Sequence, residues 1–160
     1  LLHELRLRSR TIISDMRIQV HIDGIKVFKG SNQCLWPILS RISHPVVGQP
    51  FVVGVFSGSS KPEHLDDFLH DCIMELKGLL ATGLCFPSTG MVIKVALENV
   101  ICDTPARSYI RQVLSCWAPR CQPHDIPTYT GRLRDDRSFR LRTQALHHKG
   151  RSPFEDLPID

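Results

Sequence analysis

The first sixty residues carry apolar and polar positions in an order that predicts strands. Residues 17–22 place Ile18, Val20 and Ile22 on one face, which is the two-residue period of a half-buried strand. Apolar runs rich in β-branched and aromatic residues follow at 34–39 and 51–56, with Gly, Ser and Asn between the runs. Three strands with such short breaks predict an antiparallel meander.

Beyond residue 60 the apolar period becomes helical. Pro62 stands where a helix can begin, and apolar residues then recur every three or four positions as far as Leu80. Gly83 is typical of a helix end. We therefore expect a helix over about 62–80 that packs on the sheet.

A fourth strand and a second helix complete the regular part of the chain. Residues 91–102 return to strand character, and Thr104 and Pro105 have the form of an N-cap and a first helical position for a helix through Leu114. The order of three antiparallel strands, helix, parallel strand and helix predicts a mixed α/β sheet, with 17–22 and 95–102 as adjacent parallel strands.

The regular pattern stops after Ser115. Scattered prolines and charges follow, with few apolar runs. We therefore expect a core over residues 16–115 and an irregular C-terminal insertion or arm over residues 116–160.

Composition indicates a globular protein of one domain's size. The 160 residues are 42% hydrophobic and 22% charged, which argues against disorder. No run of eighteen apolar residues and no secretion signal is visible, and the missing initiator Met suggests a piece of a longer protein. The net charge of +4 lies in the last third: residues 1–104 carry ten cations and ten anions, and residues 105–160 carry ten and six.

Nine of those ten late cations are arginine, a residue whose fork-shaped guanidinium suits phosphate. In an extended chain, alternate residues lie on the same side. Four of these arginines are at even-numbered positions and could follow a DNA backbone in that conformation: Arg132, Arg134, Arg140 and Arg142. A solvated arm that touches no nucleic acid is the alternative. Upstream, Ser57–Ser60 is either a turn or an anion site before the first helix.

Two aspartates are candidates for metal-dependent chemistry. Asp23 ends the first strand and Asp103 ends the fourth. If those strands are neighbours, both carboxylates leave one sheet edge and suit Mg²⁺ or Mn²⁺ in two-metal phosphoryl transfer. Taken singly, Asp23 and Gly24 also read as a hairpin turn, and Asp103 as support for a helix N-terminus.

Six cysteines divide into two groups. Four lie in apolar settings typical of buried reduced thiols: Cys34, Cys72, Cys85 and Cys102. The other two, Cys116 and Cys121, have a spacing that fits half of a structural zinc site. His147 or His148 would complete that site, with His124 in reserve, and a chance pair of cysteines in a loop is the alternative.

Six ordered blocks carry a resemblance to a known family. They are IDGIKVFKGSN, LWPILSRI, PFVVGVFSGSSKP, FLHDCIMELKGLL, ICDTPARSYI and LRDDRSFRLRTQALHHKGRSPFEDLPID. Together, from about Met16 to Asp160, they resemble transposase-derived proteins of animal genomes that are related to CACTA-type cut-and-paste DNA transposases.

The resemblance implies an RNase H-like catalytic core of the DDE class. Asp23 matches the family's first catalytic acid, and Asp103, followed by Ala106 and Arg107, matches the second. The family's third acid lies further downstream than this chain reaches, and none of the late acids is assigned that role: Glu155, Asp156 and Asp160. A family zinc knuckle matches Cys116, Cys121 and His147 or His148, although the family's Cys pair is two residues apart.

Two functions remain open from the sequence. The first is part of a DDE transposase that cleaves and transfers DNA strands with Mg²⁺ or Mn²⁺, with transposon ends as the DNA partner and Arg107 among the DNA-binding residues. This activity implies nuclear localisation and a homo-oligomer formed through parts outside this chain. The second is a transposase-derived module that binds nucleic acid or a partner without catalysis.

Overall fold

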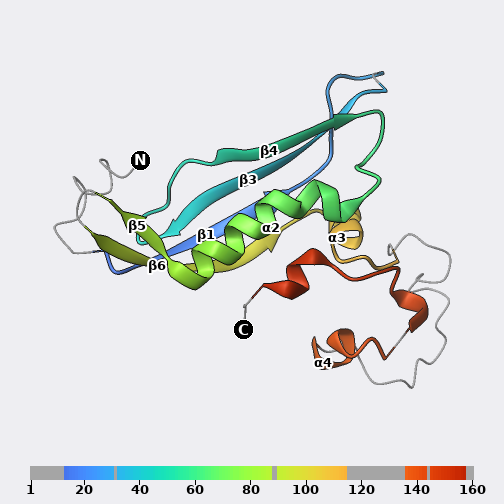
Figure 1. Ribbon diagram of the computed structural model, residues 1–160. Coiled ribbons are helices and arrows are strands. Elements are labelled where there is room, and N and C mark those ends of the chain that lie inside the picture. The colour runs from blue at the N-terminus through green and yellow to red at the C-terminus, as the bar shows by residue number, and fades with distance from the viewer. Residues whose placement is uncertain (1–12, 31, 88–89, 115–135, 144, 158–160) are drawn as a thin grey trace.

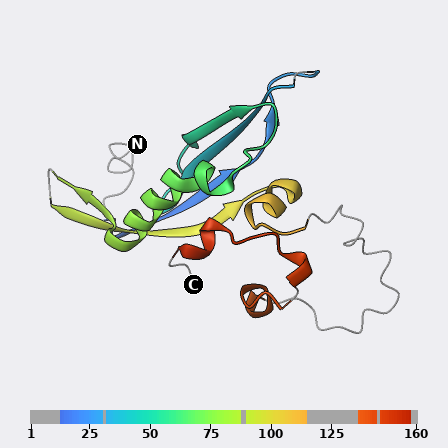
Figure 2. The same ribbon diagram turned by 45° about the vertical axis from the view of Figure 1, so that its right-hand side comes forward.

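The computed structural model describes residues 13–30, 32–87, 90–114, 136–143 and 145–157. The strands are β1 (Asp15–Ile22), β2 (Ile25–Lys26), β3 (Cys34–His44), β4 (Phe51–Gly58), β5 (Leu84–Phe86) and β6 (Met91–Ile101). The helices are α2 (Leu65–Thr82), α3 (Thr104–Ile110) and α4 (Asp136–Arg140), with the 3-10 turns η3 (Ala145–His147) and η4 (Pro153–Asp156). They form a mixed α/β fold in which α2 lies across one face of the sheet (Figures 1 and 2).

The central strand β1 joins the two halves of the sheet. It runs antiparallel to β3 on one side and parallel to β6 on the other. This confirms the prediction that 17–22 and 95–102 are adjacent parallel strands. The opposite edge of β3 pairs with β4, and β6 pairs with the short β5. The carboxyl ends of β1 and β6 therefore lie at the same edge of the sheet.

A local break separates β1 from β2. The register of both strands with β3 is continuous across this break, which sets Asp23 opposite Pro37. Proline has no backbone N–H to give to the ladder. At the next position, a Cβ on Gly24 would lie 2.7 Å from the Trp36 indole, so the ring lies directly against the backbone. Asp23 and Gly24 are thus a gap in the ladder, and their interpretation as a hairpin turn is wrong because the chain reverses only after Lys26.

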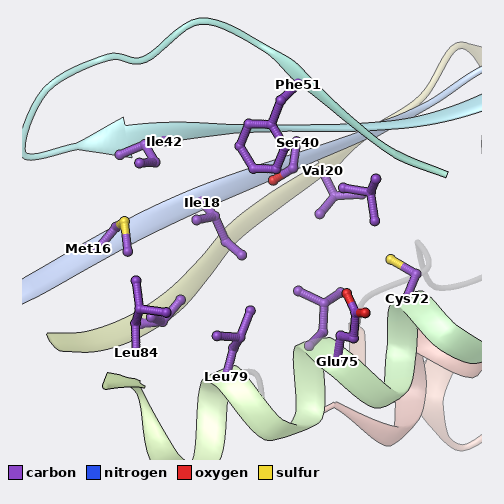
Figure 3. Close-up of a pocket in the computed structure, with 13 residues that line it drawn as sticks. Met16, Ile18, Val20, Ser40, Ile42, Phe51, Cys72, Glu75, Leu79 and Leu84 are labelled. Atoms are coloured by element: carbon purple, nitrogen blue, oxygen red, sulfur yellow. The ribbon is translucent and has the colours of Figure 1, made fainter. Parts of the chain in front are cut away.

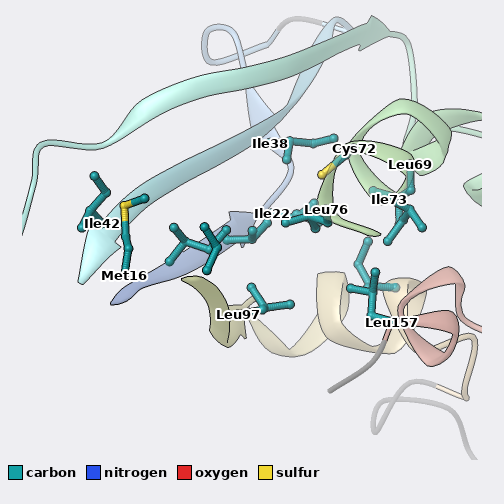
Figure 4. Packing of buried hydrophobic residues seen from close by; sticks show 14 of the residues in the cluster. Met16, Ile22, Ile38, Ile42, Leu69, Cys72, Ile73, Leu76, Leu97 and Leu157 are labelled. Carbon is teal, nitrogen blue, oxygen red and sulfur yellow. The ribbon is translucent and has the colours of Figure 1, made fainter. Parts of the chain in front are cut away.

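The core lies between α2 and one sheet face (Figure 4). Alternate residues of β1, β3 and β6 point into it, as the strand period predicted, and meet the apolar stripe of α2. Its most buried members are Val20, Ile22 and Leu69. Full burial of a side chain of this size contributes about 1.5–3 kcal/mol.

Helix α2 begins three residues later than predicted and ends where predicted. Pro62 lies outside it, and the Pro62 carbonyl instead accepts a 2.6 Å hydrogen bond from the Tyr109 hydroxyl. At the other end Gly83 has a φ of 74°, and its N–H donates to the Leu79 carbonyl. A Cβ on Gly83 would lie 2.5 Å from the Ile93 carbonyl oxygen, so glycine is required here.

The second predicted helix is shorter than the sequence pattern indicated. Asp103, not Thr104, is its N-cap, and α3 ends at Ile110 rather than at Leu114. Gln112 has a φ of 52° and turns the chain away. The freed backbone then pairs with a later segment, as the Lys149 N–H donates to the Gln112 carbonyl at 2.7 Å.

The C-terminal region contributes to the core. Residues 136–140 form α4, so the extended interpretation of the arginine run is wrong for this part of the chain. Leu157 is 6% exposed and belongs to the core cluster, which ties η4 to α2. The end of the predicted C-terminal arm therefore packs against the core through Leu157.

The second face of the sheet carries a polar network. Gln19 on β1 donates to Glu98 on β6 and accepts from Arg41 on β3, both at 2.7 Å. Hydrogen bonds from Ser43 and Gln19 hold the pKa of Glu98 below its ordinary value. Among the described residues, none of the helices has the length and apolar character needed to cross a membrane.

Candidate active site

Two carboxylates follow neighbouring strands at one sheet edge. His21 on β1 pairs with Ile101 on β6, and Asp23 and Asp103 each lie two residues further along. Neighbouring strands are about 4.8 Å apart. The two aspartates therefore leave the sheet from equivalent positions, although eighty residues separate them in the sequence.

Each carboxylate is oriented by a backbone N–H. Asp23 Oδ1 accepts from Gly24 at 2.7 Å, and Asp103 Oδ1 accepts from Ala106 at 2.7 Å. The second bond is the N-cap of α3, so the helix-support interpretation of Asp103 is confirmed. Both bonds use Oδ1, and within the described part of the chain Oδ2 of each residue has no hydrogen-bond or ion-pair partner. One oxygen of each carboxylate thus fixes its position and the other remains for a cation.

The Cys102 thiol precedes Asp103 in the chain and is influenced by both carboxylates. Burial raises its pKa, whereas a backbone hydrogen bond with Ile22 and the Arg107 guanidinium lower it. Asp23 and Asp103 both raise the pKa of this thiol. Two anions and one cation therefore act on one partly buried thiol at this sheet edge.

An aromatic wall borders the aspartates. The rings of Trp36 on β3 and Tyr109 on α3 meet edge to face with centroids 5.4 Å apart. Lys61 Nζ lies 4.9 Å from the Tyr109 ring centroid. Burial, with a smaller contribution from Asp66, raises the pKa of Tyr109 to about 12, so the phenol stays neutral and keeps its hydrogen bond at physiological pH.

A cavity of about 350 Å³ opens beside Gly24 and this wall. Its cationic lining comes from Lys26 and Lys61, and Ser59 and Ser60 add two hydroxyls. Ser57 and Gly58 belong to β4 and helix α2 begins only at Leu65, so Ser59 and Ser60 line this cavity and do not lie at the N-terminus of the helix. Cations and hydroxyls in a cavity that reaches Gly24, the residue after Asp23, suit the binding of a phosphate.

A second cavity, of about 260 Å³, lies between α2 and the sheet (Figure 3). Its walls are almost wholly apolar, with Glu75 and Ser40 as the polar residues among them besides the Cys72 thiol. The Ser40 hydroxyl already donates to the Gln19 carbonyl. Burial, with a smaller effect of Glu75, raises the pKa of Cys72 to about 11, so this thiol is an inert part of the wall.

The predicted zinc site is only partly within the described residues. Cys116, Cys121 and the reserve ligand His124 lie outside them. His147 and His148 are described, with ring centroids 5.7 Å apart, and the buried His148 Nδ1 has no hydrogen-bond partner among the described residues. No cluster of three or more metal-binding side chains occurs in the ranges that the structure describes.

The predicted DNA-binding arginines are divided among several places. Arg107 is exposed on α3, near the aspartates, and Arg140 is exposed at the end of α4. Arg142 NH2 forms an ion pair with Glu155 at 3.6 Å. Arg132 and Arg134 lie outside the described residues, as does Asp160.

Of the late acids, Glu155 and Asp156 are engaged away from the aspartate pair. Both contact Arg151, and Asp156 also lies 3.9 Å from Lys77.

Sequence reasoning did not find the side chains that frame the aspartates. Lys26, Trp36, Lys61 and Tyr109 come from four separate segments and share no linear motif. One local indication was present in the sequence, which was Lys61 next to Pro62, just before the long helix. An exposed lysine is ordinary at such a position and does not by itself indicate a site.

The comparisons with known proteins found no match for this chain. No family model and no curated protein matches its sequence, and no solved structure matches its fold.

Proposed function

We propose that this chain is part of an RNase H-like DDE-type catalytic domain for metal-dependent cleavage and transfer of DNA strands. The observation that carries the proposal is the parallel pairing of β1 and β6, which sets Asp23 and Asp103 at neighbouring positions of one sheet edge. The resemblance supplies the family, and in it a third acid lies downstream of Asp160.

The residues fit a divalent metal. Asp23 and Asp103 would hold Mg²⁺ or Mn²⁺ through Oδ2, since Oδ1 of each is fixed by a backbone N–H. Such cations prefer few carboxylates and keep several waters. When bound, they supply activation of an attacking oxygen and neutralisation of a leaving oxygen in phosphoryl transfer. Lys26 and Lys61 in the adjacent cavity would hold the DNA phosphate in place.

DNA is the substrate, specifically transposon ends. Arg107 lies on the same edge as the aspartates and would add a phosphate contact close to the reacting bond. The activity places the protein in the nucleus, in a homo-oligomer whose contacts lie outside this chain.

Titration calorimetry with Mn²⁺ tests the metal assignment. The pair should bind Mn²⁺ weakly, and Asp103→Asn should lower the affinity at least about tenfold, which corresponds to 1.4 kcal/mol. Asp71→Asn, an exposed aspartate on α2, is the matched control and should bind as the wild type does. Equal affinity in wild type and Asp103→Asn would remove Asp103 from the site.

One observation favours a second candidate, a transposase-derived module that binds nucleic acid without catalysis. The Asp103 carboxylate already has a structural role as the cap of α3. A module retained only for binding would keep this aspartate and the basic cavity, and it would bind DNA equally well with EDTA and with Mn²⁺. Tighter DNA binding with Mn²⁺ that Asp23→Asn abolishes would favour the catalytic proposal.

Zinc is a separate part of the proposal. The Leu114 N–H donates to the His147 carbonyl at 2.9 Å, and Cys116 follows Leu114 by two residues in the sequence. Cys116, Cys121 and His148, whose Nδ1 has no hydrogen-bond partner in the described part of the chain, would hold the ion. We expect about one zinc per chain by metal analysis, with none in a Cys116→Ser variant, and zinc-free wild type would contradict this assignment.

A further inference from the structure

A third cavity, of about 280 Å³, lies where α3, α4 and η4 meet. Its volume is near the lower limit of small-ligand sites, about 300–1,000 Å³. The lining combines three guanidinium groups, two phenyl rings, one hydroxyl and one carboxylate: Arg111, Phe139, Arg140, Arg151, Ser152, Phe154, Glu155 and Leu157. Neither the metal proposal nor the zinc proposal uses this cavity.

The charge of the lining is positive even after its internal ion pairs are counted. Glu155 and Asp156 form ion pairs with Arg142 and Arg151. The described carboxylates leave Arg111 unpaired, and its guanidinium carbon lies 3.9 Å from the Phe139 ring centroid. An anionic group entering the cavity therefore meets an exposed guanidinium plane that a phenyl ring already holds in place.

The cavity lining contains one buried hydroxyl group, that of Ser152. Ser152 is 4% exposed, and its O–H proton has no acceptor among the described residues. Its backbone N–H is already satisfied by Glu155 Oε1 at 3.1 Å. A buried donor left without an acceptor costs about 1–3 kcal/mol, so a ligand oxygen that accepts this proton would be stabilised.

We propose that this cavity binds one unpaired nucleotide of a DNA strand. The base would stack on the Phe154 ring or on the outer face of the Arg111 guanidinium, and Arg140 and Ser152 would contact the phosphate or a base oxygen. Arginine and aromatic side chains stack readily on bases that are out of the duplex. Bases inside a duplex have both faces covered by their neighbours, so the cavity selects a single-stranded nucleotide.

Helix α3 links this cavity to the aspartate pair. Asp103 caps its first turn and Arg111 its last, which puts the two residues about 12 Å apart at 1.5 Å per residue. A strand that reaches the aspartates can therefore place a nucleotide a few positions away in the cavity. The inference rests on the proposed function only for its choice of DNA as the source of the nucleotide.

Fluorescence anisotropy with the whole chain in EDTA tests the cavity without metal. The probe is a labelled twelve-residue thymidine strand, compared with a duplex and with a strand of twelve abasic residues. We expect the thymidine strand to bind more tightly than both. Loss of one stacked base corresponds to about 1–3 kcal/mol, or about 5- to 150-fold in affinity.

Arg111→Ala should weaken binding of the thymidine strand by a factor within that range. Arg137→Ala is the matched control, since Arg137 is an exposed arginine of α4 that does not line the cavity, and it should change affinity less than about threefold. Ser152→Ala is the second variant and should weaken binding about 2- to 13-fold through one lost hydrogen bond. Thermal unfolding of each variant verifies the fold, and Arg111→Lys replaces Arg111→Ala if the latter unfolds.

Three results would overturn the inference. Equal losses in Arg111→Ala and Arg137→Ala would mean diffuse electrostatic binding, and equal affinity for the abasic strand would remove the stacked base. If thymidine monophosphate displaces the strand at the same concentration of nucleotides, the cavity binds free nucleotides and not DNA. None of these results changes Mn²⁺ binding by Asp23 and Asp103, so this inference and the proposed function fail separately.

Discussion

Asp103 combines a structural role with a proposed metal role, and two substitutions separate them. Asparagine keeps an oxygen that can accept the Ala106 N–H, whereas alanine removes it. Loss of an N-cap costs about 0.5–2 kcal/mol, typically about 1. Because α3 buries Ala106 and Ile110, the cost should appear in global unfolding. We expect Asp103→Ala to lose about 1 kcal/mol of unfolding free energy and Asp103→Asn only a few tenths.

Urea unfolding followed by far-UV circular dichroism, with EDTA present, measures this difference. With a slope of about 2 kcal/mol per M, a loss of 1 kcal/mol lowers the urea midpoint by about 0.5 M. Both variants should lose Mn²⁺ binding, since neither keeps the charge. Equal destabilisation of the two variants would refute the cap argument, because the cost would then come from the lost charge and not from the lost acceptor.

Three further predictions concern stability and titration. Leu69→Ala removes a side chain that is 0% exposed and should lower the unfolding free energy by about 2–5 kcal/mol in urea, and a loss below 1 kcal/mol would contradict the described core. Gly83→Ala should cost at least about 1–2 kcal/mol, because its φ is 74° and the new Cβ would meet the Ile93 carbonyl; an unchanged melting temperature would be inconsistent with this. Tyr109 should ionise near pH 12 in an absorbance titration of a Tyr129→Phe variant. Because its folded pKa lies above the unfolded value near 10, its contribution to stability is complete below pH 10 and is lost as pH rises through 12, whereas ionisation near 10 would mean an exposed phenol.

The sequence was sufficient for the arrangement of the sheet. The two-residue period in 17–22 and the helical period after residue 60 each follow from which side chains must be buried, and the structure confirms both. The adjacency of β1 and β6 followed from the order of elements, since a helix between two strands brings them parallel. This adjacency is also what placed Asp23 beside Asp103.

Errors arose where tertiary contacts override local preference. Pro62 is a good first residue of a helix, but its carbonyl is bound by Tyr109, forty-seven residues away. The apolar residues after Ile110 fit a helix, yet pairing with residues 147–149 turns the chain at Gln112. The cavity between α3, α4 and η4 was not predictable for the same reason, because its arginines and phenyl rings come from segments that only the folded chain brings together.

The position of β1 also determines the order in which the molecule can fold. Sixteen residues separate Ile22 from its partner Ile38 on β3, whereas eighty separate His21 from its partner Ile101 on β6. The nearby partner closes a short loop and pairs early, and the distant partner pairs late because a longer loop costs more entropy to close. During synthesis the hairpin half of the sheet is available well before β6 has left the ribosome. Asp23 is therefore in place first, and the carboxylate pair exists only in molecules that have completed the long-range step.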